Sequence, residues 1–340
     1  MSELYERVNR LRENVNKAIV GQEEIVTTLI TGLLANGNIL VEGLPGLAKT
    51  RAIKALADHL EGTFGRIQFT PDMVSQDIVG RFEYVEHDGE RVFEFVKGPV
   101  FNNVVLADEI NRAPSKTQNS LLEAMEERQV TAGGVSYKMP DLFMVMATMN
   151  PVDQEGTFKL PEAQLDRFLM HISVFYPDEE AEQNIIRLVR AEQSQKARKE
   201  AAERKEKKEV EITSQETIFQ ARGEIDYIEV SDAIERYIID IIFATRYPGR
   251  ISYDLKAFCK MGASPRASLG IDRCARAHAW LHGRKEVTVE DVRAVLKPVL
   301  RHRIVRGKRA IEHNATTDDI IAHLIEVIPP SKDAPRAESE

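Results

Sequence analysis

Two glycines, a lysine and a threonine are spaced in this chain as a phosphate-binding turn requires. The stretch Val41–Thr50 reads VEGLPGLAKT and puts Gly43, Gly46, Lys49 and Thr50 at the positions of a phosphate loop. In such a loop the backbone N–H groups wrap the phosphates, the lysine reaches the β and γ oxygens, and the hydroxyl binds magnesium. The pattern therefore predicts a site for a nucleotide and Mg²⁺.

Ala48 stands where the usual pattern has glycine. It opens a predicted helix, where φ is negative and alanine is comfortable, so we expect it to be tolerated. Taken alone, the fragment also fits a Gly/Pro strand-to-helix turn with an exposed lysine. The residues expected to contact the nucleotide here are Gly43, Leu44, Pro45, Gly46, Leu47, Ala48, Lys49, Thr50 and Arg51.

A pair of acids follows a second apolar run, Val104–Glu109, which reads VVLADE. At the end of a buried strand, Asp108 can hold Mg²⁺ and Glu109 can polarise a water. Two adjacent acids are commonly just a solvated turn. An apolar strand that ends in them, downstream of a phosphate loop, favours the catalytic interpretation.

Short apolar runs alternate with helical patterns through the first half of the chain. The runs lie at 38–41, 66–69, 104–107 and 142–147, and a helix, a turn and a second helix are predicted before them, over 15–34. This alternation predicts a mainly parallel sheet with right-handed crossovers. Turn residues at Asp88–Gly89 and Gly133–Gly134 predict two inserted hairpins, within 81–98 and 128–141.

Beyond residue 177 helical patterns replace the strands. One apolar face there is Ile234, Tyr237, Ile238, Ile241 and Ile242, and Thr288 with Asp291 forms a variant capping box. The expected organisation is an α/β core over 1–177 and a smaller all-helical lid over 178–328. The lid contains a charged insertion at about 192–224, of which residues 195–209 are expected to form a solvated protrusion, and the tail 329–340 is expected to be flexible.

Composition limits the classes of protein. The 340 residues carry a net charge of -8, which argues against general nucleic-acid binding. We find no transmembrane run, and the charged amino terminus is unlike a secretory signal, so the expected location is the cytoplasm. The two cysteines, Cys259 and Cys274, are expected to be buried structural thiols in helices.

Seven motifs together resemble the MoxR branch of the AAA+ ATPases, over about Leu11 to Ile328. They are GLPGLAKT, LADEINRAP, EAMEERQVT, ATMNP, LPEAQLDRF, GASPRA and VLRHRI. The resemblance implies an AAA+ P-loop core with a helical lid. It also implies a functional nucleotide site, because alanine before the loop lysine is common in that family.

The resemblance assigns roles to further residues. Val20 and Gly21 would lie against the adenine, and Asn150 would be sensor 1, orienting the attacking water. Arg167 would be the arginine finger that reaches the nucleotide of the adjacent subunit, and Arg266 would be sensor 2, acting within its own subunit. By themselves, Asn150 also fits a turn that closes a strand, and Arg167 a surface ion pair.

The function that the resemblance implies is a Mg-ATP-dependent, ring-forming ATPase, as a hexamer, that remodels protein clients in a chaperone-like way. Partners with von Willebrand factor A domains are implied as well. A nucleic-acid-directed motor or regulator is an alternative, although we find no GAFTGA loop of the sigma-54 activators. A non-hydrolysing nucleotide-gated scaffold is another, against which Glu109, Asn150 and Arg167 together argue.

Overall fold

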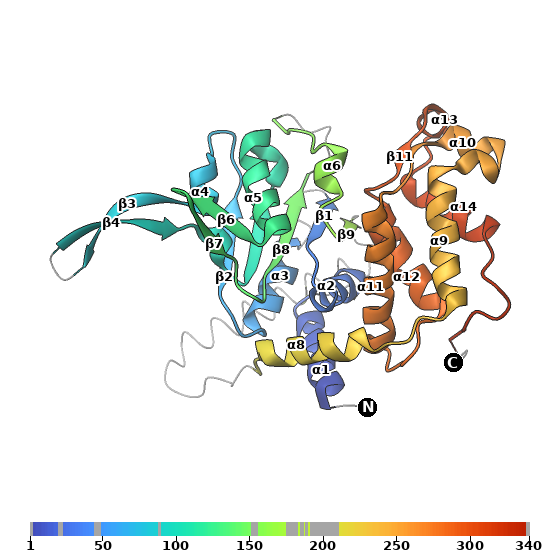
Figure 1. Ribbon diagram of the computed structural model, residues 1–340, viewed down its shortest axis with the longest axis horizontal. Coiled ribbons are helices and arrows are strands. Elements are labelled where there is room, and N and C mark those ends of the chain that lie inside the picture. The colour runs from blue at the N-terminus through green and yellow to red at the C-terminus, as the bar shows by residue number, and fades with distance from the viewer. Residues whose placement is uncertain are drawn as a thin grey trace.

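The computed structural model describes residues 3–19, 23–43, 49–87, 90–150, 156–174 and 211–337, with the single positions 183, 187 and 190. The side chains of Lys49 and Asp254 lie outside this description. An α/β core lies between a helical lid and two projecting hairpins (Figure 1). The predicted fold class is confirmed by this arrangement.

The core is a five-stranded sheet in which every pairing is parallel. Its spatial order is β2-β5-β8-β1-β9. The strands are β1 (Ile39–Gly43), β2 (Phe64–Gln68), β5 (Val104–Asp108), β8 (Met144–Met149) and β9 (Met170–Val174). Because β1, β5 and β8 are neighbours, the segments that follow them meet at one edge.

Successive side chains of each strand face opposite helical layers, as the pleat requires. Val104 and Leu106 pack with one layer of helices, whereas Val105 and Ala107 pack with the other. The first layer is α1 (Glu3–Lys17), α2 (Glu23–Leu34) and α3 (Lys49–Asp58); the second is α4 (Ser75–Val79) and α5 (Ser115–Glu127), with the short α6 (Glu162–Leu165) before β9. Burial on both faces explains why these strands read as continuous apolar runs.

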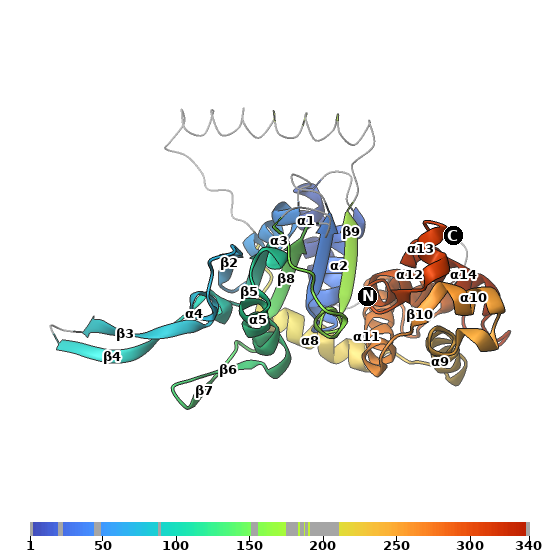
Figure 2. The ribbon, with the colours of Figure 1, turned by 90° about the horizontal axis from the view of Figure 1, so that it is seen from above.

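Both expected hairpins are present. The longer pairs β3 (Gly80–His87) with β4 (Glu90–Lys97), and the shorter pairs β6 (Gln129–Ala132) with β7 (Val135–Lys138). The turn at 88–89 lies outside the described residues. The long hairpin and the lid extend from opposite ends of the core (Figure 2).

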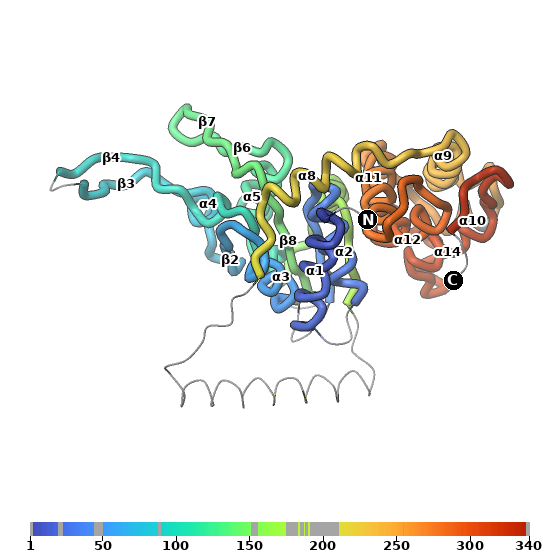
Figure 3. The backbone as a smooth tube through the Cα atoms, turned by 90° about the horizontal axis from the view of Figure 1, so that it is seen from below, coloured from blue at the N-terminus to red at the C-terminus, as the bar shows by residue number. Residues whose placement is uncertain are grey.

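The protrusion expected at 195–209 lies outside the described residues, whereas the end of the charged insertion is described and packs on the core. Residues 215–226 form helix α8, which buries Ile218, Ala221 and Ile225 and lies along the core (Figure 3). The Arg222 guanidinium donates to the Leu33 carbonyl at 2.7 Å, at the carboxyl end of α2, where a cation is favoured. Residues 211–226 therefore pack with the core, because α8 has an apolar stripe that the 192–210 stretch lacks.

The lid is mainly helical, with one departure from the all-helical expectation. A two-stranded ribbon pairs β10 (Cys259–Met261) with β11 (Val305–Arg306), so Cys259 lies in a strand, whereas Cys274 is helical as expected. Both thiols are buried and free, and burial raises the pKa of Cys274 to about 12. The helices are α9 (Asp232–Arg246), α10 (Tyr253–Phe258), α11 (Pro265–Leu281), α12 (Val289–Leu300), α13 (Lys308–Glu312) and α14 (Thr317–Val327).

Helix ends in the lid follow from local sequence. The predicted capping box at Thr288 is present, with the Asp291 N–H donating to the threonine hydroxyl, and Thr316 repeats it with Asp319. The expected buried face of α9 is confirmed. Within the described parts of the chain, no helix is long and apolar enough to cross a membrane.

The tail is not frayed as far as residue 337. The Val289 N–H donates to the Pro335 carbonyl at 3.0 Å, and the Ala337 N–H donates to the Glu290 carboxylate at 2.8 Å. Ala334 is buried against the lid. The first contact satisfies an orphan N–H group at the start of α12, and both contacts hold the tail in place.

A buried polar cluster fastens the lid to the core. Arg303, after α12, donates to the Asp166 carboxylate at 2.8 Å and to the Phe168 carbonyl at 2.6 Å. The neighbouring His302 ring is 3.0 Å from the same carbonyl. Burial, together with the charges of Arg303, His171 and Arg301, lowers the pKa of His302 well below its ordinary value.

His302 is expected to make stability depend on pH. Its pKa in the folded chain lies below 6.5, so the stability contributed by the neutral ring is complete above the unfolded pKa and falls as the pH drops below it. Between pH 7.5 and 5.5 this one ring should remove about 1.4 kcal/mol from the free energy of unfolding. Urea unfolding of the native chain and of His302→Gln measures the difference, with the exposed His323→Gln as the control. An equal pH dependence in the native and His302→Gln chains would contradict the assignment.

Candidate nucleotide site

The two ends of the predicted phosphate loop lie at the carboxyl edge of the sheet. Gly43 ends β1, and Lys49 and Thr50 begin α3. Residues 44–48, and with them Leu44, Pro45, Gly46, Leu47 and Ala48, lie outside the described residues, as do Val20 and Gly21. The strand-to-helix context of the loop is therefore present on both sides of it.

Gly43 is required by packing as well as by its place in the loop. A Cβ atom there would lie 2.7 Å from the Val174 carbonyl oxygen in β9. Arg51 also has a structural role, because its Nε donates a hydrogen bond to the Ala18 carbonyl at 2.6 Å. That bond ties α3 to the chain just before the segment expected to contact the adenine.

Asp108 and Glu109 follow β5, and a single hydroxyl holds both of them. The Thr148 hydroxyl donates to Asp108 Oδ1 at 2.7 Å and accepts from the Glu109 N–H at 2.9 Å. Parallel pairing of Ala107 with Ala147 puts Asp108 and Thr148 side by side. Thr148 is buried, so these bonds form away from solvent.

Glu109 has a left-handed backbone, with φ 56° and ψ 49°. A side chain other than glycine adopts this conformation at some cost, and such positions cluster at functional sites. With this turn, the Glu109 N–H donates to the Thr148 hydroxyl, and the Glu109 carboxylate accepts from the Asn150 amide. The Thr148 bond is one interaction that offsets the strain.

Three donors orient the Glu109 carboxylate. Asn150 Nδ2 lies 3.1 Å from Oε1, while Gln68 Nε2 and Arg112 Nε lie 3.2 Å and 3.1 Å from Oε2. Asn150, at the end of β8, is itself buried and paired with Asn111 through two hydrogen bonds. The structure therefore brings Glu109 and Asn150 together, as the predicted catalytic and sensor roles require.

Asp108 has the donor chemistry for a hard cation. Its Oδ1 is taken by Thr148, and its Oδ2 lies 2.7 Å from the half-exposed Arg66 guanidinium. An ion that displaces the Arg66 guanidinium could bind Asp108 Oδ2, which lies at the same edge of the sheet as the Thr50 hydroxyl. Carboxylate and hydroxyl oxygens suit Mg²⁺.

Arg167 and Arg266 lie elsewhere, at the amino edge of the sheet. Both line a cavity of about 240 Å³ together with Asn36 and Asn38, which precede β1. A five-residue strand is about 16 Å long. The length of the strands therefore separates the two arginines from Glu109. The expectation that Arg266 senses the nucleotide of its own subunit does not agree with this placement.

The arginine cavity carries an excess of positive charge. Two acids and five arginines line it: Glu126, Asp166, Arg128, Arg167, Arg266, Arg273 and Arg303. Arg266 is held at 2.5 Å by Glu126, whereas the Arg167 side chain makes no hydrogen bond or ion pair within the described parts of the chain. Burial, aided by the charge of Arg273, lowers the pKa of Arg128. This crowding favours an anion.

Comparisons with known proteins agree with this geometry. Residues 38–170 match the model of the ATPase family associated with various cellular activities (AAA), and residues 255–324 match an AAA lid domain. The chaperone MoxR1 of Mycobacterium tuberculosis is 41% identical over 92% of this chain and 80% of its own length. This chain belongs to the MoxR family of AAA+ ATPases.

Two further relatives extend over nearly the whole chain. The protein MoxR of Methylorubrum extorquens is 32% identical over 94% of each chain. A crystal structure of a Cytophaga hutchinsonii protein assigned as an ATPase superposes with a TM-score of 0.85 at 37% identity, over 97% of this chain and 96% of that one. Family membership makes this chain a nucleotide-binding ATPase.

Sequence reasoning missed five residues of this MoxR-family site. The residues that complete the network around Asp108 and Glu109 are Thr148, Gln68, Asn111, Arg112 and Arg66. Thr148 lies inside the motif ATMNP, and Asn111 and Arg112 lie inside LADEINRAP, so the motifs themselves could have indicated these three. Gln68 and Arg66 carried no signal, because only the pairing of β2 with β5 places them there.

Thr148 is expected to position the catalytic acids. Thr148→Val keeps the shape but removes both hydrogen bonds, so ATP turnover should fall about 10- to 100-fold. The unpaired Glu109 N–H should cost about 1–3 kcal/mol of stability. Thr148→Ser, which keeps the hydroxyl, is the matched control and should retain most of the turnover. Native turnover in the valine variant would show that the hydroxyl does not position the site.

Proposed function

We propose that this MoxR-family chain is a Mg²⁺- and ATP-dependent ATPase that works as a ring of identical subunits, a hexamer as the resemblance implies. One observation carries the proposal: the acids and the arginines lie at opposite edges of the same sheet. A second copy that presents its amino edge to the first would bring both halves together. Two half-sites on one chain are what a head-to-tail ring needs.

In the proposed reaction each residue has one task. Asn150 and Glu109 orient and polarise the attacking water, and Thr148 keeps the two acids in place. Thr50 and Asp108 would hold Mg²⁺, which neutralises phosphate charge when bound. Arg167 from the adjacent subunit would stabilise the charge of the transition state.

Arg266 shares the cavity with Arg167, so in this scheme it would also contact the nucleotide of the adjacent subunit. This replaces the role within its own subunit that the motif suggested. Its present partners, Glu126 and Asp166, would be exchanged for phosphate. The exchange links nucleotide binding in one subunit to the lid of the next.

Subunit mixing tests the shared site. Glu109→Gln and Arg167→Ala should each lower turnover by about 100-fold or more, since each removes a group that acts only in the transition state. Turnover of the native chain should rise with protein concentration. An equal mixture of the two variants should recover part of the activity, because some interfaces then combine an intact Glu109 with an intact Arg167.

The matched control for Arg167 is Arg236→Ala, an exposed arginine on α9. It should leave turnover unchanged. Turnover that is independent of dilution, together with full activity of Arg167→Ala, would rule out the shared site.

We further propose that the ring remodels protein clients, with the long hairpin as their contact. Tyr84 and Phe93 are 72% and 58% exposed near its outer half, and their ring centroids lie 5.0 Å apart. Large exposed aromatic rings are typical of protein contact sites. The M. tuberculosis relative is named a chaperone, which supports the proposed action on protein clients. A von Willebrand factor A domain partner rests on the motif resemblance.

The hairpin proposal predicts a separation of two activities. Tyr84→Ser with Phe93→Ser should leave basal ATP turnover unchanged, because the hairpin lies far from the sheet edge that binds nucleotide (Figure 2). Binding of fluorescently labelled casein, an unfolded model client, should weaken at least about tenfold, as expected for loss of two aromatic anchors. Val135→Ser on the short hairpin is the control. Unchanged casein binding by the double variant would exclude this surface.

A further inference from the structure

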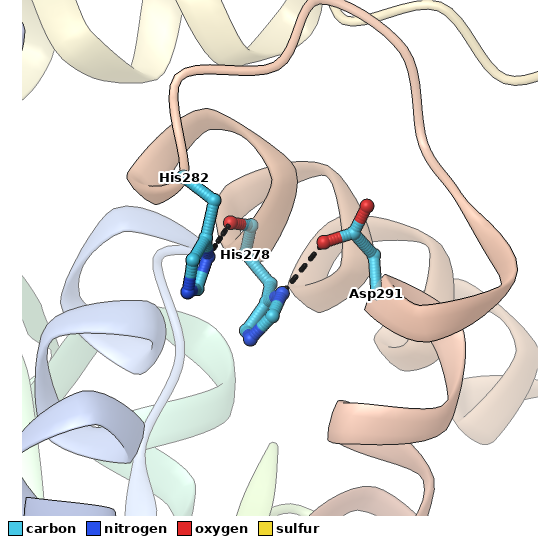
Figure 4. A group of neighbouring side chains, drawn as sticks. All are labelled: His278, His282 and Asp291. Atoms are coloured by element: carbon cyan, nitrogen blue, oxygen red, sulfur yellow. Dashed lines mark hydrogen bonds and ion pairs between the residues drawn. The ribbon is translucent and has the colours of Figure 1, made fainter. Parts of the chain in front are cut away.

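Two histidines lie one turn apart at the carboxyl end of α11, outside the nucleotide site. His278 and His282 differ by four positions and so lie on the same helical face. Their ring centroids are 4.2 Å apart (Figure 4). Pairs of histidines at this spacing on a helix are a common half of a transition-metal site.

Hydrogen bonds set the tautomer of both rings. His278 Nδ1 is 2.6 Å from Asp291 Oδ1, and His282 Nδ1 is 2.8 Å from the His278 carbonyl. A carboxylate and a carbonyl only accept, so each Nδ1 carries the proton. Each Nε2 then has a free lone pair, and Figure 4 shows both outer nitrogens directed away from Asp291.

Burial and several hydrogen bonds fix the orientation of the Asp291 carboxylate. It is fully buried and accepts from the Thr288 N–H at 2.9 Å, from the Thr288 hydroxyl at 2.8 Å and from Arg284. A fixed carboxylate on the far nitrogen of a histidine is the usual support of a metal-bound imidazole. Asp291 thus orients the His278 ring.

Open space adjoins His278. His278 lines a cavity of about 310 Å³ between α2 and α12, whose α2 wall carries Glu24, Thr27, Thr28 and Thr31. This polar wall can hold water, and the Glu24 carboxylate adds negative charge for a cation. One ring nitrogen of each histidine and one Asp291 oxygen already lie within 4.8 Å of one another.

We propose that His278 and His282 bind a divalent transition-metal ion of the zinc type through their Nε2 atoms, with water from the cavity in the remaining positions. The ion would lie about 2.0–2.1 Å from each nitrogen. It would cross-link the last turn of α11 to His282, the residue that caps this helix. The site is separate from the Mg²⁺ expected beside Asp108, whose ligands are oxygens.

Zinc binding is measured on the untagged full chain, stripped with a chelator and kept free of nucleotide and magnesium. Calorimetric titration with ZnCl₂ should give one saturable site, and zinc should raise the melting temperature. Co²⁺, used as a spectroscopic probe, should show visible absorption from imidazole coordination.

Matched variants assign the site. His278→Gln and His282→Gln should each weaken zinc binding at least about tenfold, and the double variant should abolish it along with the Co²⁺ absorption. His313→Gln is the control, because His313 makes the same Nδ1 contact with a carbonyl four residues back but has no histidine four positions from it in the sequence. It should bind zinc as the native chain does.

Two results would overturn the proposal. One is the absence of saturable binding by the native chain. The other is undiminished zinc binding or Co²⁺ absorption in the double variant, which would place the ion elsewhere. If a variant is less stable without metal, the Co²⁺ spectrum of the native chain still decides, because imidazole coordination must be visible there.

Discussion

Parallel pairing is the constraint on which the rest of this molecule depends. Because β5, β8 and β1 are adjacent and run the same way, the residues after each of them are brought to one edge. β9 also runs this way, so the chain must return to the opposite edge before Met170. The same geometry that gathers Glu109 and Asn150 therefore carries Arg167 away from them.

This separation explains why one chain contains two incomplete halves of a site. The carboxyl edge has the two acids, Asn150 and the first residue of the predicted phosphate loop. The amino edge has a cavity crowded with arginines and few acids. Burial, with the charge of Arg273, lowers the pKa of Arg128 there. Cations packed this closely favour a bound anion, which the neighbouring subunit's nucleotide would supply in the proposed ring.

The lid depends on a second, buried interaction. Arg303 spans from the lid to the Asp166 carboxylate and to main-chain carbonyls just before β9, so the segment that carries Arg167 is held on both sides. Burial lowers the pKa of Arg303, but the Asp166 charge opposes that shift and keeps the pair ionic. A change in the nucleotide that moved Arg266 from Asp166 would act directly on this cluster.

Several features were determined by the sequence alone, because they depend on neighbours along the chain. The acids after an apolar run, the two hairpins and the Thr288 capping box are local, and each was predicted with its residues. The order of strands and helices followed from periodicity, and the family from its motifs. Local reasoning also predicted a frayed tail, and it was wrong as far as residue 337, because the contacts of the tail lie far away in the sequence. Residues 44–48 of the phosphate loop and the protrusion expected at 195–209 lie outside the described residues, so both stay predictions.

Only the tertiary structure decided which side chains meet. Thr148 bridges Asp108 and Glu109 because of the β5–β8 register, and Gln68 reaches Glu109 because β2 lies beside β5. The sequence likewise could not reveal at which edge of the sheet Arg266 lies, because its motif is the same whether the arginine contacts the nucleotide of its own subunit or that of the adjacent subunit. Motifs record the chemistry of a residue, whereas its partners depend on strand order and lid packing, which bring together segments more than a hundred positions apart.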